Sequence, residues 1–451
     1  MFARKTLLLF LALLNAAAYH YAYVTFLHVI FGYADFRYEQ TSVTYLLWTY
    51  FSTVFPIIAV RKSQSPSTIG ATLIYIFNYV PIQLTLTFMA AEKNSALVFT
   101  QVILMLSMIA LFRSSSGRTL PDQKAINYST LTQLNRLTAP IYLLTALGLF
   151  LVYYEYYSVM RIVSFEDVYD LRSQASGISV WTITDYLAMW ISAVFGPFYI
   201  ARALFLSRKI DWLIGIICFL TIYLAFGSKG ALMMTLFILL LKYLNKSNSD
   251  FSVRLLWAMS VFVLLAALII PNEGIWGWIN SIFLMRVLGS SGWTAAVYYE
   301  YFSSHDFTYY THIGPVNALF GDYPYGENSL GQEIAMHYFG NEANFNSGFW
   351  ASDGFAAMGA AGIPVVTVFL GVFMRLIDRL GFHFPAQFIN FWLLGFWMVL
   401  MNAPFTTALL SGGGLFIALL LWLARPSPDT KVLRLGLDSA GNNFNNSEKV
   451  A

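Results

Sequence analysis

Charge and cysteine are what this sequence has least of. Only 11% of its 451 residues are Asp, Glu, Lys or Arg, against about 25% in an average soluble domain, and 58% are hydrophobic. So few charges cannot cover the surface of a soluble protein of this length, and the apolar content excludes a disordered chain. The single cysteine, Cys218, excludes a disulfide scaffold. A net charge of only +3 argues against a nucleic-acid partner.

What remains is a chain surrounded mostly by lipid. A hydrocarbon core about 30 Å thick is crossed by about 20 apolar residues in a helix, and the long, unalternating apolar runs exclude barrel strands. The sequence therefore predicts an all-α, polytopic integral membrane bundle of about twelve spans. These form one domain, 1–424, followed by a disordered cytoplasmic tail, 425–451. The predicted spans are 7–31, 41–60, 69–91, 95–112, 138–158, 181–205, 212–226, 231–244, 255–271, 355–374, 385–403 and 408–424.

Lys and Arg resist translocation, so their positions predict which segments stay in the cytoplasm. With twelve spans and both termini cytoplasmic, only six of the 26 Lys and Arg residues fall outside. Reading 212–244 as one span would instead leave 12 inside and 13 outside, so two spans are favoured there. The six outer cations are Arg37, Lys93, Arg161, Arg172, Lys229 and Arg286.

Two outer loops are large, 160–180 and 272–354. The second is 83 residues long and carries eight acids but a single cation, Arg286. Connections of this length are usually functional. Its many aromatic residues suit either anchoring in the membrane–water interface or stacking on carbohydrate. We expect short interfacial helices lying on the outer leaflet.

Three of the outer cations are the strongest candidates for a binding site. Lys229 lies in a Gly-Ser-Lys-Gly turn between two short apolar runs, and such interrupted segments can expose helix ends that bind anions. Arg172 and Arg286 lie one in each large outer loop, and an arginine fork grips phosphate oxygens in a bidentate fashion. Together the three could hold a pyrophosphate. The alternative is that Arg172 pairs with Asp170 and Arg286 with a loop acid.

Other polar residues carry weaker signals. The position of Arg161, between Glu155 and Glu166, favours an ion pair with one of these two acids. Glu333 and His337 are four residues apart, on one face of a helix, where either could take a proton from an attacking hydroxyl. The alternative is a capping glutamate beside a surface histidine. No zinc-type spacing, P-loop or dinucleotide fingerprint is present, so we predict no metal and no cofactor.

Several motifs and their order resemble the O-antigen repeat-unit polymerases of the Wzy type. The likeness covers roughly residues 150–424 and includes the two large outer loops. The motifs are Ala-Phe-Gly-Ser-Lys-Gly at 225–230, Leu-Gly-Gln-Glu-Ile at 330–334, Asn-Phe-Asn at 344–346 leading to Gly-Ala-Ala-Gly at 359–362, and Asn-Ala-Pro-Phe-Thr-Thr-Ala-Leu-Leu-Ser-Gly at 402–412.

This resemblance implies a GT-C-like glycosyltransferase of the bacterial inner membrane, working at the periplasmic face. Such enzymes join oligosaccharide repeat units carried on undecaprenyl pyrophosphate. The family's loop arginines would be Arg172 and Arg286, with Arg161 as a further candidate, and its basic turn position would be Lys229. The implied partners are the lipid-linked oligosaccharide, membrane lipids and a chain-length regulator protein.

Three other functions remain open at this point. An O-antigen ligase shares the general plan but transfers the finished chain to lipid A-core. A lipid-linked oligosaccharide flippase or secondary transporter would show charged residues within the spans and usually internal repeats, and neither is evident. A purely structural membrane protein would not need a large acidic loop with an isolated arginine. We rank the polymerase first.

Overall fold

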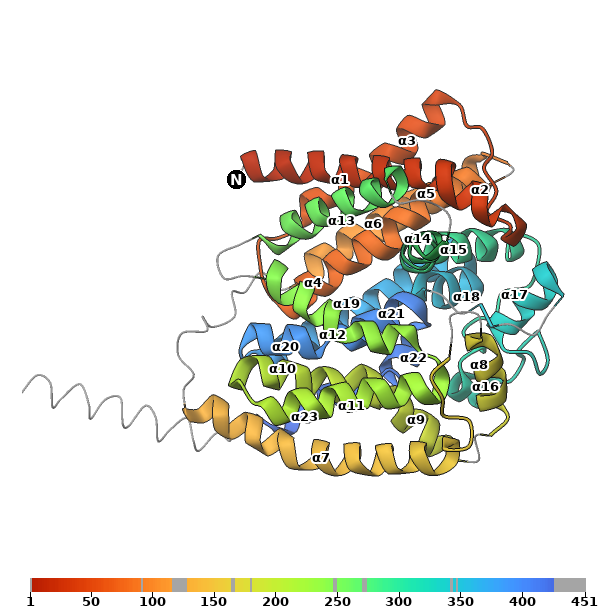
Figure 1. Ribbon diagram of the computed structural model, residues 1–451. Coiled ribbons are helices and arrows are strands. Elements are labelled where there is room, and N and C mark those ends of the chain that lie inside the picture. The colour runs from red at the N-terminus through yellow and green to blue at the C-terminus, as the bar shows by residue number, and fades with distance from the viewer. Residues whose placement is uncertain are drawn as a thin grey trace, which may run out of the picture.

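The structure of the protein is a computed structural model (Figure 1). It describes residues 2–90, 92–115, 128–163, 167–178, 181–245, 250–269, 274–340, 344–345 and 348–425. Most of the predicted tail, 425–451, therefore lies outside the described residues. Helices make up 80% of these described residues, and no strand occurs among them.

Nine stretches of helix are long and apolar enough to cross a membrane, counted over the described part of the chain. This confirms the predicted class, an all-helical membrane protein. The nine are α1 to η2 (Phe2–Ala34), α4 to α5 (Pro66–Met89), α6 (Ser95–Ser114), the end of α7 (Asn135–Tyr156), α9 to α10 (Thr182–Leu206), α11 (Lys209–Phe226), α13 (Phe251–Leu268), η7 to α19 (Ala351–Gly381) and α22 to α23 (Phe405–Leu423).

The other three predicted spans also coincide with helices, but shorter ones. They are α3 with η3 (Val43–Ala59), α12 (Lys229–Leu244), and α20 with α21 (Ala386–Asn402). Every predicted span range is thus helical, while the count of twelve crossings stays a prediction.

The centre of the bundle is the helix from α4 (Pro66–Ile74) through η4 (Tyr75–Tyr79) to α5 (Val80–Met89), which is buried almost throughout. One element of the long outer loop joins it there. Helix α15 (Ser290–Tyr301) packs against α5, and a Cβ added at Gly292 would lie 2.7 Å from the Pro81 carbonyl oxygen. Because only glycine allows this approach, α15 is a buried part of the bundle rather than an interfacial helix.

The two ends of the bundle differ in what they carry. Near the N-terminus, Arg4 forms an ion pair with Asp250, and Arg61 donates to the carbonyl of Ser115. The opposite end carries short helices of the two large loops, namely α8 (Val168–Ser176), α16 (Gly314–Phe320) and α17 (Leu330–Phe339) (Figure 1). The segments predicted to be outer thus gather at one end.

Labelling of introduced cysteines tests the predicted orientation. The native Cys218 is fully buried and should give little background. We expect Ser303→Cys, exposed beyond α15, to react with a membrane-impermeant maleimide in intact spheroplasts. Lys209→Cys, exposed at the start of α11, should react only after permeabilisation. The opposite pattern would show that the predicted orientation is inverted.

Candidate functional site

Arg172 is placed by the docking of α8 on the end of α11. Val168 and Leu171 pack over Gly227, where the backbone φ is +61° and an added Cβ would lie 3.0 Å from Val168 Cγ1. A side chain at position 227 would both strain the backbone and push α8 away. The exposed Arg172 side chain reaches back, and its Nε donates to the carbonyl of Phe226 at 3.4 Å.

Lys229 is the first residue of α12, two residues beyond Gly227. Its side chain is half-buried. Ser228 precedes the helix but makes no side-chain capping hydrogen bond, and an added Cβ at Gly230 would meet nothing within 4 Å. The start of α12 therefore presents a cation and helix N–H groups toward open space, an arrangement that favours anions.

Arg286 comes from a third, distant part of the chain. It lies in η6 (Ser281–Gly289), a π-helix that joins α14 (Gly274–Asn280) to α15. The Asn280 side chain donates to the carbonyl of Ala266 at 2.9 Å, which ties this segment to α13. The Arg286 side chain is exposed.

The structure brings these three cations together. Burial lowers the pKa of Lys229, and the charges of Arg172 and then Arg286 lower it further. We call Arg172, Lys229 and Arg286 the cation cluster. The cluster therefore gathers like charges around a half-buried lysine, which disfavours the charged form of that lysine. The expected alternative partner of Arg172, Asp170, forms no ion pair with it.

Arg161 lies near the same turn through its backbone, whose N–H donates to the carbonyl of Leu224 at 3.3 Å. Its side chain is exposed. The predicted ion pair with Glu155 is wrong, because Glu155 accepts a hydrogen bond from Thr184 Oγ1 at 2.7 Å instead. The other predicted partner, Glu166, lies outside the described residues.

Glu333 and His337 share one face of α17, as their spacing predicts. Tyr301 donates to Glu333 Oε1 at 3.1 Å, and Asn328 donates to Oε2 at 3.2 Å. His337 is exposed and lies edge-on to Tyr301, with ring centroids 5.0 Å apart. In the described part of the chain, these contacts do not include the cation cluster. The predicted site residues thus form two groups. One is the cation cluster with Arg161 near it, and the other is Glu333 with His337.

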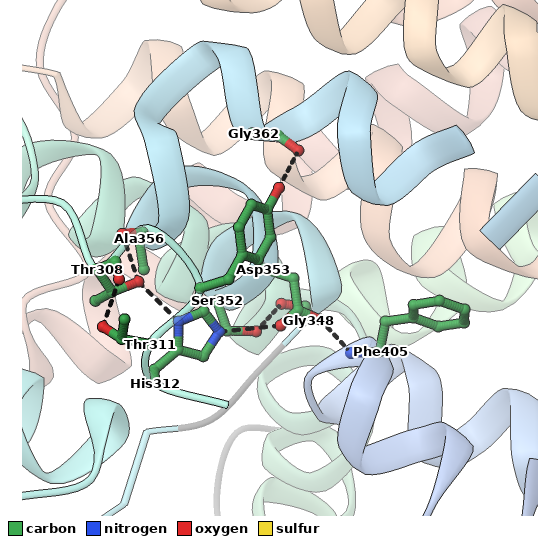
Figure 2. A network of polar contacts seen from close by, with 10 residues as sticks. Thr308, Thr311, His312, Gly348, Ser352, Asp353, Ala356, Gly362 and Phe405 are labelled. Atoms are coloured by element: carbon green, nitrogen blue, oxygen red, sulfur yellow. Dashed lines mark hydrogen bonds and ion pairs between the residues drawn. The ribbon is translucent and has the colours of Figure 1, made fainter. Parts of the chain in front are cut away.

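A buried acid–histidine pair is the feature that sequence reasoning missed. His312 Nε2 lies 3.1 Å from Asp353 Oδ1, and their side chains are only 5% and 3% exposed (Figure 2). Thr308 Oγ1 lies 2.7 Å from His312 Nδ1, and the other Asp353 oxygen accepts from the N–H of Phe405. Both ring nitrogens are therefore occupied by protein groups. The pair fastens the outer loop to η7 (Ala351–Phe355) and to the start of α22 (Phe405–Leu409).

The sequence gives little sign of this pair. The two residues are 41 positions apart, one within the long loop and one just before a predicted span. The available clue is the acid itself, because a carboxylate entering an apolar segment needs a partner. Nothing in the spacing identifies His312 as that partner.

Comparison of the chain with protein-family models, with curated proteins and with solved structures gave no match. The interpretation of the site therefore rests on the contacts described above and on the chemistry of its residues.

Replacing Asp353 tests the role of the buried pair. Asp353→Asn removes the charge that His312 and the Phe405 N–H both contact, and losing one member of a buried pair typically costs about 3–5 kcal/mol. We expect a clearly lower thermal unfolding temperature in detergent. Asp322→Asn, an equal charge change at an exposed loop residue, is the control. Equal unfolding temperatures for the two variants would contradict a fastening role.

Proposed function

We propose that this protein is a membrane glycosyltransferase that polymerises undecaprenyl-pyrophosphate-linked oligosaccharide repeat units of O-antigen or a related polysaccharide. It acts at the periplasmic face of the bacterial inner membrane, with both termini in the cytoplasm. The supporting observation is the cation cluster, in which two arginines from separate segments lie close enough to Lys229 for their charges to lower its pKa. The motifs that resemble Wzy-type polymerases add to it.

The cluster suits the leaving group of this reaction. During transfer, the bond between the donor sugar C1 and the pyrophosphate oxygen breaks, and negative charge builds on that oxygen. Arg172 and Arg286 offer planar forks of donors and Lys229 a point charge, so together they can stabilise the departing diphosphate. Arg161, beside the same turn, is the further candidate contact. Binding of an anion would also relieve the repulsion among the three like charges.

The acceptor sugar supplies the other half of the chemistry. Its hydroxyl oxygen forms the new bond to C1 and gives up its proton, for which Glu333 or His337 is the proposed acceptor. In this proposal the cation cluster binds the donor pyrophosphate, and Glu333 and His337 contact the acceptor glycan. Membrane lipids and a chain-length regulator protein are the further proposed partners.

Substitution of Arg286 tests the donor site. Loss of one preorganised donor to a developing oxyanion typically costs about 10²–10³ in rate. We expect Arg286→Ala to abolish long polysaccharide ladders on gels, and Arg286→Lys to restore them only partly because lysine lacks the bidentate fork. Arg136→Ala, at an exposed site predicted to be cytoplasmic, is the matched control. Normal ladders in both Arg286 variants at normal protein levels would remove this residue from the mechanism.

Substitution of Lys229 tests whether the cluster is kept for function at the expense of stability. The pKa of Lys229 is lowered in the folded protein, so the unfolded chain binds more protons between that pKa and the ordinary value of about 10.4. Unfolding stability should therefore rise with pH across this window. Lys229→Met should flatten the rise and increase thermal stability near neutral pH, while polymerisation falls.

Stability and polymerisation of the Lys229→Met variant must be measured on the same preparation. Lys246→Met, a charge change at a residue predicted to be cytoplasmic, is the control for net charge. A variant that is less stable than the parent would show that the Lys229 charge supports the fold instead.

A further inference from the structure

A second polar cluster lies on the outer loop, built around the end of α15 and the face of α17. The tyrosine–histidine cluster consists of Tyr301, His305, Tyr323, Tyr325, Glu333 and His337. Tyr301 and His305 stack almost parallel, with ring centroids 3.9 Å apart, and His337 stands edge-on to both. Tyr323 and Tyr325 meet at 5.7 Å. The result is a group of aromatic rings with polar edges.

The polar atoms of this cluster are only partly satisfied. Glu333 accepts from Tyr301 and from Asn328, but the Tyr323 hydroxyl is buried and has no hydrogen-bond partner among the described residues. An unpartnered buried hydroxyl is costly and points to a missing polar ligand. Meanwhile His305 and His337 are exposed at the edge. The cluster thus combines aromatic rings, two exposed histidines and the Tyr323 hydroxyl, which has no partner among the described residues.

The phenols remain hydrogen-bond donors at neutral pH. Burial, first of all, and then nearby charges and hydroxyls raise the pKa of Tyr301 and Tyr323. Burial also raises the pKa of Tyr325 to about 12, although its hydrogen bond with Tyr301 acts in the opposite direction. Tyr301 donates its O–H to Glu333, and Tyr325 donates its O–H to the Asp306 carbonyl. A ligand here therefore meets the Tyr323 O–H group, imidazole edges, a side-chain amide and a carboxylate. Such a mixture on an aromatic surface is suited to a ligand rich in hydroxyls.

The charge of the surrounding chain further limits the class of ligand that fits the cluster. Residues 287–374 contain no Lys or Arg but seven acids, so an anionic group would be repelled. The cluster itself holds a single carboxylate, Glu333, which is already shared with Tyr301 and Asn328, so it offers a cation no set of carboxylate ligands. An uncharged ligand is therefore favoured here, whereas the cation cluster favours an anion.

We infer that the tyrosine–histidine cluster is a binding site for an uncharged oligosaccharide, held by ring stacking and by a hydrogen bond from the Tyr323 hydroxyl. The inference deepens the proposed function and rests on it for the source of the glycan, which would be the acceptor repeat unit. Within the site, Glu333 orients Tyr301 and Asn328, and Tyr323 gains the partner that it lacks in the protein.

Glycan binding by the full-length protein in lipid nanodiscs tests this inference. The probe is a panel of uncharged oligosaccharides, with amino-sugar and uronate oligosaccharides as charged counterparts, read by saturation-transfer NMR. We expect binding of uncharged members only. Glu333→Gln and Tyr323→Phe should each weaken it tenfold or more, and the phenylalanine variant keeps the packing intact. Glu327→Gln, the same chemical change at an exposed residue on this loop, should bind like the parent.

The outcomes separate this inference from the proposed function. No binding of any uncharged oligosaccharide, binding of charged members only, or unaltered binding by Glu333→Gln and Tyr323→Phe would each overturn the site. Polymerisation that is lost in Arg286→Ala would still uphold the proposed function in those cases. Conversely, glycan binding lost in Tyr323→Phe, with polysaccharide ladders unchanged in cells that lack this protein, would keep the site and reject the polymerase.

Discussion

No water is available inside a bilayer to hydrogen-bond a peptide group, so each backbone N–H and C=O must find its partner within the protein. Helices meet this need, and each range that the hydropathy marks as a span coincides with one or more helices in the described part of the chain. Helices also leave their last polar groups unpaired at their ends. The turn between α11 and α12 is such a place. There Arg172 donates to the carbonyl of Phe226 at the end of α11, and Lys229 is the first residue of α12. The lipid environment therefore limits unpaired backbone polar groups to the ends of the bundle.

The cation cluster is held by small contacts acting against electrostatic repulsion. Two apolar side chains, Val168 and Leu171, seat α8 on Gly227 and so bring Arg172 to the turn. The pKa of Lys229 is lowered first by burial and then by the charges of the two arginines. The tyrosine–histidine cluster has a different character, because residues 287–374 carry no Lys or Arg and the nearby Arg37 is paired with Glu300. One end of the molecule therefore offers two chemically distinct surfaces, one suited to a diphosphate and one to sugar hydroxyls.

Much of this arrangement follows from the sequence, because hydrophobic length and the distribution of Lys and Arg are local properties. Both predict the helical spans and single out Arg172, Lys229 and Arg286. Contacts across long separations could not be predicted in the same way. The pairing of His312 with Asp353, and the burial of α15 against α5, depend on how distant helices pack. The hydrogen bond from Thr184 to Glu155 likewise replaced an ion pair that sequence spacing had favoured.

The buried carboxylate of Asp353 has a consequence for how the protein is made. It joins a loop residue that precedes it in the chain to the backbone of Phe405, which the ribosome adds about fifty residues later. The loop therefore gains its last attachment only when the final helices enter the membrane. A chain interrupted before that point would keep the contact between His312 and Asp353 but lack the hydrogen bond from Phe405, so the buried carboxylate is fully satisfied only after α22 is made.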